Sequence, residues 1–264
     1  MTNEYNFILD GIIFSFSSVG SYKTCPYAFK LSYIDHKERK NNFYGEYGSF
    51  LHEILQKYFT GELEIWDLSL YYQNNYDTMV KTSPPPYPKN MAQTYYDDGL
   101  NFFDNFEFDK NKYEIILIED SVYTQYNGIK FIAKPDLVLK EKETGKYILF
   151  DYKTSKLKGN KFDAKKLDDY KIQFYFYAWS LYVERNIKID EITIWFVRDG
   201  KMVNVPIDLF EVANVVVGFE EVIKKIKDDT EWKANTDRSN DYFCSFLCGV
   251  SPFCSYQLEK LGIA

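Results

Sequence analysis

Three charged residues near the middle of the chain carry the strongest chemical signal. Pro135-Asp136 is followed, after fourteen residues, by Asp151-Tyr152-Lys153. Because side chains alternate along a strand, Asp151 and Lys153 point to the same face, and a hairpin would bring Asp136 beside them. Two carboxylates so close together are unfavourable unless a cation neutralises them. The spacing therefore predicts a cation site.

Hard oxygen ligands of this kind favour Mg²⁺ or Mn²⁺. Such an ion activates water and stabilises negative charge on a phosphoryl oxygen. Lys153 would then orient the water or stabilise the charge that develops on the phosphate. The alternative is a hairpin that carries ordinary surface charges, because a pattern as short as P-D…D-x-K recurs by chance.

Four cysteines form a second candidate ligand set. One lies near the start of the chain and three lie within eleven residues near its end: Cys25, Cys244, Cys248 and Cys254. Four thiolates can ligate one iron-sulfur cluster of the 4Fe-4S type or one structural zinc ion. Zinc sites usually contain paired Cys-x₂-Cys knuckles, and buried free thiols are the remaining alternative. A disulfide framework is not expected, because residues 1–16 lack the basic start of a secretory signal.

The composition limits the class of protein. The 264 residues include 24 Tyr, 22 Phe and 4 Trp, which excludes disorder as the main state. No run of 18 apolar residues occurs, so we expect no membrane span and a cytoplasmic protein, or one in the host cytoplasm if the source is a virus. The net charge of −7 alone argues against nucleic acid. However, the balance reverses over residues 151–171, where seven lysines occur: Lys153, Lys156, Lys158, Lys161, Lys165, Lys166 and Lys171. The alternative there is a solvated helix face.

The hydrophobic periodicity predicts an α/β chain with a central sheet flanked by helices. Segment 62–90 is rich in Tyr and ends in three prolines, which favours an extended connector. Turns are expected at Asn127-Gly128, Thr144-Gly145 and Asp199-Gly200. Helices are predicted over 15–33 with a break at Pro26, and over 45–59, 91–106, 167–184 and 209–227; strands are predicted over 113–126, 129–139, 146–152, 191–197 and 202–205.

These residues resemble the PD-(D/E)XK nuclease superfamily, and within it the RecB-like exonuclease branch. Residues 48–52 are similar to the G-x-x-x-H helix of the branch, residues 148–154 to its D-Y-K-T strand, and residues 173–177 to its Q-x-x-x-Y helix. The resemblance implies that His52 joins Asp136 and Asp151 as a metal ligand, together with the backbone carbonyl of Tyr152. Glu119 resembles an acidic position upstream of the aspartate.

The same resemblance assigns residues to the nucleic acid. Gln173 and Tyr177 lie four apart on one helix face and would contact a DNA strand. Lys134 stands where the branch more often has Arg, and it would take over that basic role without the bidentate fork. Lys156 is the fourth predicted DNA contact. The small Gly48 would permit close approach of a strand or ligand.

The cysteines resemble those of the iron-sulfur members of the branch, which include the CRISPR-adaptation exonucleases and the AddB helicase–nuclease subunits. In these proteins one Cys precedes the core and three follow it. The chain departs from that pattern because three residues, not two, separate Cys244 from Cys248. Because of this departure, the sequence does not decide between an iron-sulfur cluster and a zinc ion. The resemblance favours the cluster and implies that its role is structural.

The resemblance implies one nuclease domain over 1–264 with a restriction-endonuclease-like core. Residues 1–44 and 240–264 would form the iron-sulfur cap, 61–110 a helical or loop insertion, and 111–230 the core. The implied activity is metal-dependent exonucleolytic hydrolysis of DNA, at single-stranded ends and 5′ to 3′. One alternative is an iron-sulfur module that binds DNA ends for a helicase or a CRISPR integrase. A zinc-stabilised protein of another function is the second alternative, and the sequence predicts no oligomeric state.

Overall fold

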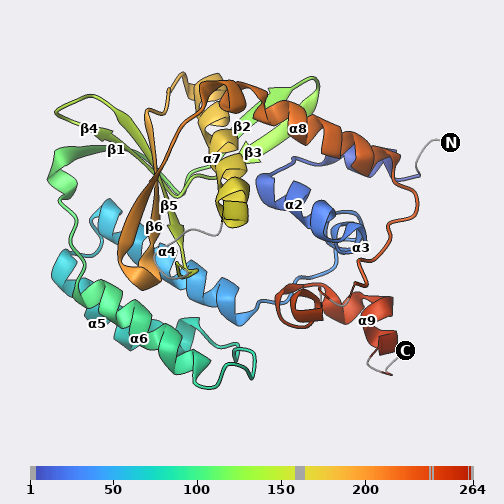
Figure 1. Ribbon diagram of the computed structural model, residues 1–264, viewed down its shortest axis with the longest axis horizontal. Coiled ribbons are helices and arrows are strands. Elements are labelled where there is room, and N and C mark those ends of the chain that lie inside the picture. Colours follow the sequence, from blue (N-terminus) through green and yellow to red (C-terminus); the bar gives the residue numbers. More distant parts are fainter. Residues whose placement is uncertain (1–3, 158–163, 238, 240, 261, 263–264) are drawn as a thin grey trace. The chain divides into compact units, whose positions relative to one another are not determined.

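The structure is a computed structural model that describes residues 4–157, 164–237, 239, 241–260 and 262 (Figure 1). The chain forms two compact units. The first, called the sheet unit below, consists of Phe43–Val122 and Lys134–Ala213. The second, called the terminal unit, consists of Met1–Asn42, Tyr123–Ala133 and Asn214–Ala264. Each unit is built from segments that are far apart in the sequence.

The sheet unit contains a five-stranded mixed sheet with the order β1-β4-β5-β6-β7. Neighbouring strands are antiparallel except β5 and β6, which are parallel. The central strand β5 is buried at five of its seven positions, as expected for a strand covered on both faces. This confirms the predicted α/β class. The strands are β1 (Tyr113–Ile118), β4 (Leu137–Glu141), β5 (Tyr147–Lys153), β6 (Glu191–Phe196) and β7 (Lys201–Val205).

Four helices complete the sheet unit: α4 (Phe43–Thr60), α5 (Leu68–Met79), α6 (Met91–Asp104) and α7 (Ala164–Arg185). Short 3-10 turns also occur over Ile65–Asp67, Lys110–Lys112 and Val197–Asp199. Helix α4 buries the apolar side chains that recur along it at intervals of three and four, and they join an aromatic core with α5, α6 and the sheet. The prediction of an extended connector over 62–90 is wrong for residues 68–79, which form helix α5. There Leu68, Tyr72 and Tyr76 place a buried residue on every fourth position.

Two predicted strands are each divided in two, so the predictions over 113–126 and 129–139 are wrong as single strands. The first breaks after β1 at Glu119, whose φ of 46° lies in the left-handed region and cannot continue a strand. The second breaks between β3 (Ile129–Ala133) and β4, where Pro135 offers no N–H to a neighbouring strand. Asp136 therefore lies immediately before a strand and not within one.

The terminal unit joins residues from both parts of the chain that flank the sheet unit. Strands β2 (Val122–Tyr126) and β3 form a two-stranded sheet with a turn at Asn127 and Gly128, both at positive φ, as predicted. Ring stacking between Phe29 and Trp232, 6.0 Å between centroids, ties the N-terminal helices to the C-terminal segment. The helical elements are α1 (Asn6–Gly11), α2 (Phe16–Thr24), α3 (Pro26–Phe29), α8 (Leu209–Asp228, from Asn214 onward) and α9 (Ser255–Lys260), with further turns over Lys30–Ile34, Phe243–Leu247 and Ser251–Phe253.

The predicted break near Cys25 is confirmed, because α2 ends before this residue and α3 begins after it with Pro26 at its first position. In the described part of the chain, no helix combines the length and the apolar composition that a bilayer crossing requires.

Candidate active site

The end of β5 places Asp151 and Lys153 on one face of the sheet, as the alternation of side chains predicts. Asp151 is 1% exposed, and its Oδ2 atom lies 2.6 Å from Lys153 Nζ. The buried carboxylate is thus paired with the ammonium of Lys153. A carboxylate has two oxygens with about four lone-pair sites, so Asp151 can pair with Lys153 and still serve as a ligand for a metal ion.

The hairpin of β4 and β5 brings Asp136 to this place, since Leu137 pairs with Phe150 in the antiparallel ladder. Asp136 Oδ2 accepts a hydrogen bond of 2.7 Å from the backbone N–H of Tyr152. The sequence prediction that a hairpin would bring the two aspartates together agrees with this geometry.

His52 and Glu119 complete the group. His52 Nδ1 lies 3.1 Å from Glu119 Oε1 and 3.5 Å from Asp136 Oδ1, and its Nε2 lies 3.3 Å from the carbonyl oxygen of Tyr152. The ligand atoms of His52, Glu119 and Asp136 lie within 4.8 Å of one another. Glu119 reaches this position because its backbone N–H donates to the carbonyl of Asp136, 2.9 Å away.

The charges of this group are balanced only in part. Burial, and then the charge of Asp151, raises the pKa of Asp136 well above its ordinary value. Burial opposes a charge on His52, but Asp136 and Glu119 outweigh it and raise the pKa of His52 to about 9. Crowded carboxylates beside an imidazole are the donor set that a divalent cation binds. The residues at this site therefore fit Mn²⁺ or Mg²⁺.

A row of polar contacts leads from Lys153 along α7. Lys153 Nζ donates to Gln173 Oε1 at 3.0 Å, and Gln173 Nε2 donates to the hydroxyl of Tyr177 at 2.8 Å. The ammonium also lies 5.0 Å from the ring centroid of Tyr170. The structure thus brings the predicted Gln173 beside Lys153 and Tyr177 beside Gln173. The Gln173 amide contacts both the Lys153 ammonium and the Tyr177 hydroxyl.

The other predicted nucleic-acid residues lie in different surroundings. Lys134 is 55% exposed and forms an ion pair of 2.8 Å with Glu119, so it lies at the rim of the site. Lys156 pairs with Asp98 of α6 at 2.8 Å. Lys158 and Lys161 of the basic run lie outside the described residues, as do the side chains of Lys165 and Lys166.

Gly48 lies one turn before His52 on α4. A methyl group at this position would meet only Thr154, at 3.9 Å, which is an ordinary van der Waals distance. The packing of the described chain therefore does not require glycine at position 48.

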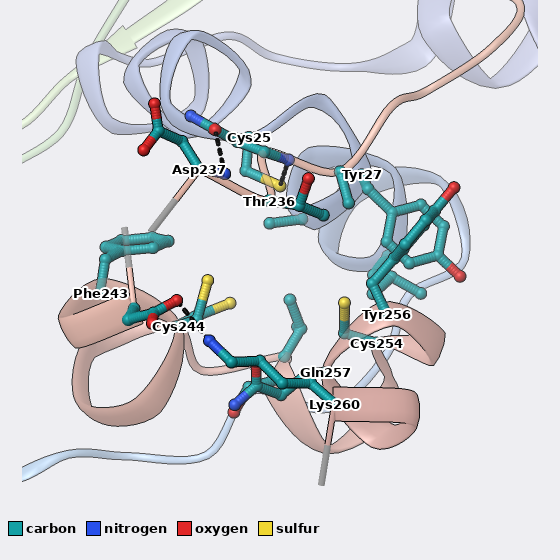
Figure 2. A pocket seen from close by; sticks show the side chains of 18 of the residues that line it. Cys25, Tyr27, Thr236, Asp237, Phe243, Cys244, Cys254, Tyr256, Gln257 and Lys260 are labelled. Carbon is teal, nitrogen blue, oxygen red and sulfur yellow. Dashed lines mark hydrogen bonds and ion pairs between the residues drawn. The ribbon is translucent and has the colours of Figure 1, made fainter. Parts of the chain in front are cut away.

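The four cysteines lie together in the terminal unit and line one cavity of about 320 Å³. Figure 2 shows the sulfur atoms of Cys25, Cys244 and Cys254 directed toward the same space. All four thiols are free, and among the described residues no three of them lie within 4.8 Å of one another. The rest of the wall combines apolar side chains, among them Leu31, Phe243 and Val250, with charged ones, among them Asp241 and Lys260.

Backbone N–H groups point at the thiols. The N–H of Asn235 donates to Cys25 Sγ at 3.4 Å, and backbone N–H groups also reach the sulfurs of Cys248 and Cys254. Donors of this kind stabilise thiolates and tune a metal centre. Burial and the neighbouring thiols raise the pKa of Cys244, so the metal-free group favours the neutral thiol.

The unusual spacing of Cys244 and Cys248 has a structural explanation. Residues Phe243–Leu247 form a π-helical turn, in which the N–H of Cys248 bonds to the carbonyl of Phe243 at 2.8 Å. Such a turn holds one residue more than an α-helical turn. The extra residue between the two cysteines is thereby accommodated while both sulfurs line the cavity.

The chain was compared with known families and structures. A sequence model of the PD-(D/E)XK nuclease superfamily matches residues 13–255. No curated protein matches the sequence. Among solved structures, the fold is similar to the crystal structure of a "putative exonuclease" from Eubacterium rectale, with a TM-score of 0.53 and 15% identity over 87% of this chain and 88% of that chain.

Proposed function

Because the chain belongs to the PD-(D/E)XK nuclease superfamily, we propose that it is a metal-dependent DNA exonuclease that acts on single-stranded ends in the 5′ to 3′ direction. The convergence of His52, Glu119, Asp136, Asp151 and Lys153 at the end of β5 is the observation that carries the hydrolytic part of this proposal. The name of the similar structure supports exonuclease over endonuclease activity. The 5′ to 3′ direction follows from the resemblance of the motifs.

The residues have separate tasks in this proposal. His52, Glu119 and Asp136 would hold the divalent ion, with Asp151 and the carbonyl of Tyr152 as further ligands. When bound, the ion activates water and stabilises negative charge on the phosphate. The sites predicted from the sequence alone did not include Glu119 among the ligands, and the geometry adds it.

Lys153 would act as a cation and not as a base. Burial opposes its charge, but Asp151 and Asp136 outweigh that effect and raise the pKa of Lys153 above its ordinary value. A protonated ammonium at this position can stabilise the charge that develops on the phosphate. Gln173 fixes the ammonium through its carbonyl oxygen, and Tyr177 fixes the Gln173 amide.

The terminal unit would hold a 4Fe-4S cluster on Cys25, Cys244, Cys248 and Cys254. Tetrahedral zinc with Zn–S bonds of about 2.3 Å requires sulfurs about 3.8 Å apart. The cavity of about 320 Å³ that the four cysteines line supports a larger group. Iron and acid-labile sulfide in the purified protein would be expected, whereas zinc alone would overturn this part of the proposal.

Cleavage of end-labelled DNA with Mn²⁺ or Mg²⁺ tests the activity. We expect shortening of single strands with a free 5′ end, and protection when that end is blocked or the strand is circular. Lys153→Ala should abolish cleavage, whereas Lys140→Ala, which changes a half-buried lysine of neighbouring β4, should not. Cleavage of circular strands would contradict exonuclease action. Tight binding of DNA ends without cleavage in any metal would instead favour the accessory end-binding module.

A further inference from the structure

The short segment that follows Lys153 is held at each of its four residues, Thr154–Leu157. The carbonyl of Thr154 accepts from Arg198 Nη1 at 3.5 Å, and the Ser155 hydroxyl lies 3.1 Å from that of Tyr170. Lys156 Nζ pairs with Asp98 Oδ1 at 2.8 Å. The N–H of Leu157 donates to Asp199 Oδ2 at 2.7 Å. Three of these four contacts involve Asp98 or the turn that contains Arg198.

Asp98 of α6 joins the two cations on this segment. Its Oδ2 atom accepts two hydrogen bonds from Arg198, at 3.0 Å from Nε and 2.7 Å from Nη2, while its Oδ1 atom faces Lys156. Arg198 is 8% exposed and Asp98 is 17% exposed. A charge-assisted pair that is shielded from water in this way is stronger and more directional than a surface ion pair.

The pair is itself held in place. The Arg198 guanidinium lies 3.4 Å from the ring centroid of Tyr95, which lies one turn before Asp98 on α6. The hydroxyl of Tyr47 on α4 donates to the carbonyl of Tyr95 at 2.9 Å. At Gly99, a methyl group would collide with the hydroxyl groups of Tyr72 and Tyr47. Helix α6 therefore has little freedom to shift.

The register of the sheet connects this pair to the candidate active site. Lys153 pairs with Phe196 in the parallel ladder of β5 and β6, and the turn with Arg198 begins at the next residue, Val197. Parallel strands end at the same edge of a sheet. The Arg198–Asp98 pair thus contacts Thr154 and Lys156, directly after the last residue of β5.

We infer that Asp98 and Arg198 are positioning residues for the candidate active site. They hold Thr154–Leu157, and through that segment they keep the Lys153 ammonium on Asp151 and Gln173. This inference rests on the proposed nuclease function. Neither residue belongs to the sequence patterns described above, and neither is assigned to contact the metal or the DNA.

A mutant cycle with two readouts tests the inference. Asp98→Asn, Arg198→Gln and the double variant are compared with Asp97→Asn, which makes the same change at the neighbouring exposed position of α6. Steady-state cleavage of a labelled single strand with Mn²⁺ gives kcat and KM. Amide hydrogen exchange, measured without DNA, reports the mobility of residues 154–157.

Each single variant should lower kcat about ten- to a hundredfold, the scale of a small misplacement of a reacting group, at unchanged KM. The kcat of the double variant should be no lower than that of the less active single variant. Amide hydrogen exchange over residues 154–157 should be faster than in the parent protein. Asp97→Asn should match the parent protein. A wild-type kcat in both single variants, or additive losses in the double variant, would overturn the inference.

The two proposals fail in different ways. If the parent protein cleaves DNA but the pair does not affect kcat, only the positioning inference fails. If the parent protein does not cleave DNA in any metal, the nuclease proposal fails, and hydrogen exchange then decides alone. Unchanged exchange over 154–157 in Asp98→Asn would show that the pair does not hold the segment.

Discussion

The two candidate ligand sets of this chain are built in opposite ways. In the sheet unit, the acids and His52 are already in contact with one another and with Lys153, and backbone hydrogen bonds of β1, β4 and β5 fix their places. In the terminal unit, short turns carry thiols around an open cavity. The first set is organised by contacts among its own side chains, whereas the thiols of the second surround space that the proposed cluster would fill.

The largest predicted effect that separates the two ligand sets is the loss of nuclease activity in Asp151→Asn. Losing one charged group of the site should lower cleavage about 10³-fold, because the amide neither binds a cation well nor pairs with Lys153. The iron content that the proposed cluster would give and the melting of the terminal unit should stay unchanged. The exposed Asp168→Asn on α7 is the control, and iron loss in Asp151→Asn would show that the two sets are not independent.

Removal of one thiol should have the opposite result. In Cys254→Ala, the iron of the proposed cluster should fall to a small fraction of the parent value. The terminal unit should then unfold at lower temperature, because the cavity that the cluster would fill is left empty. The sheet unit should keep its hydrogen-exchange protection. Exchange mass spectrometry separates the units, and equal loss of protection in both would contradict the contrast.

Addition of a divalent ion should stabilise only the sheet unit. At a Mn²⁺ concentration of about 100 times Kd, binding to the folded state contributes about 2.7 kcal/mol to the free energy of unfolding. His52→Ala should remove most of this gain because it deletes a ligand at the centre of the group. Urea unfolding with and without Mn²⁺ measures the effect, and equal stabilisation of the His52→Ala protein would contradict the assigned ligand set.

Two glycines give the smallest and most local comparison. A methyl group at Gly249 would lie 2.9 Å from the carbonyl oxygen of Lys40, so Gly249→Ala should destabilise the terminal unit by about 1–3 kcal/mol. Gly48→Ala meets only ordinary contacts within a helix, and it should stabilise the sheet unit by about 0.5–1 kcal/mol. Denaturant unfolding of both variants measures the change in the free energy of unfolding. Changes of the opposite sign would contradict this description of the two sites.

Much of the sheet could be predicted because its signals are local. Asp151 and Lys153 end an apolar strand, and Gly128, Gly145 and Gly200 mark turns that the structure places at positive φ. The two divided strands show where local reasoning ended. Pro135 offered a usable signal because it cannot donate to a ladder. Glu119 offered little, since a glutamate at positive φ is uncommon.

Contacts between distant segments could not be predicted from one sequence. Asp98 and Arg198 are a hundred positions apart, and their pairing follows from how α6 lies against the end of β6. Helix α5 is different, because Leu68, Tyr72 and Tyr76 repeat at a helical interval that was hidden by the high Tyr content of the segment.

The origin of the four thiols has a consequence for biosynthesis. The terminal unit takes Cys25 from the beginning of the described chain and Cys254 from near its end. The segments of the sheet unit leave the ribosome before Cys254 does, and units generally fold as they emerge. The four thiols of the proposed cluster site are therefore complete only after the segments of the sheet unit have been synthesised, and nascent chains should form the candidate active site first.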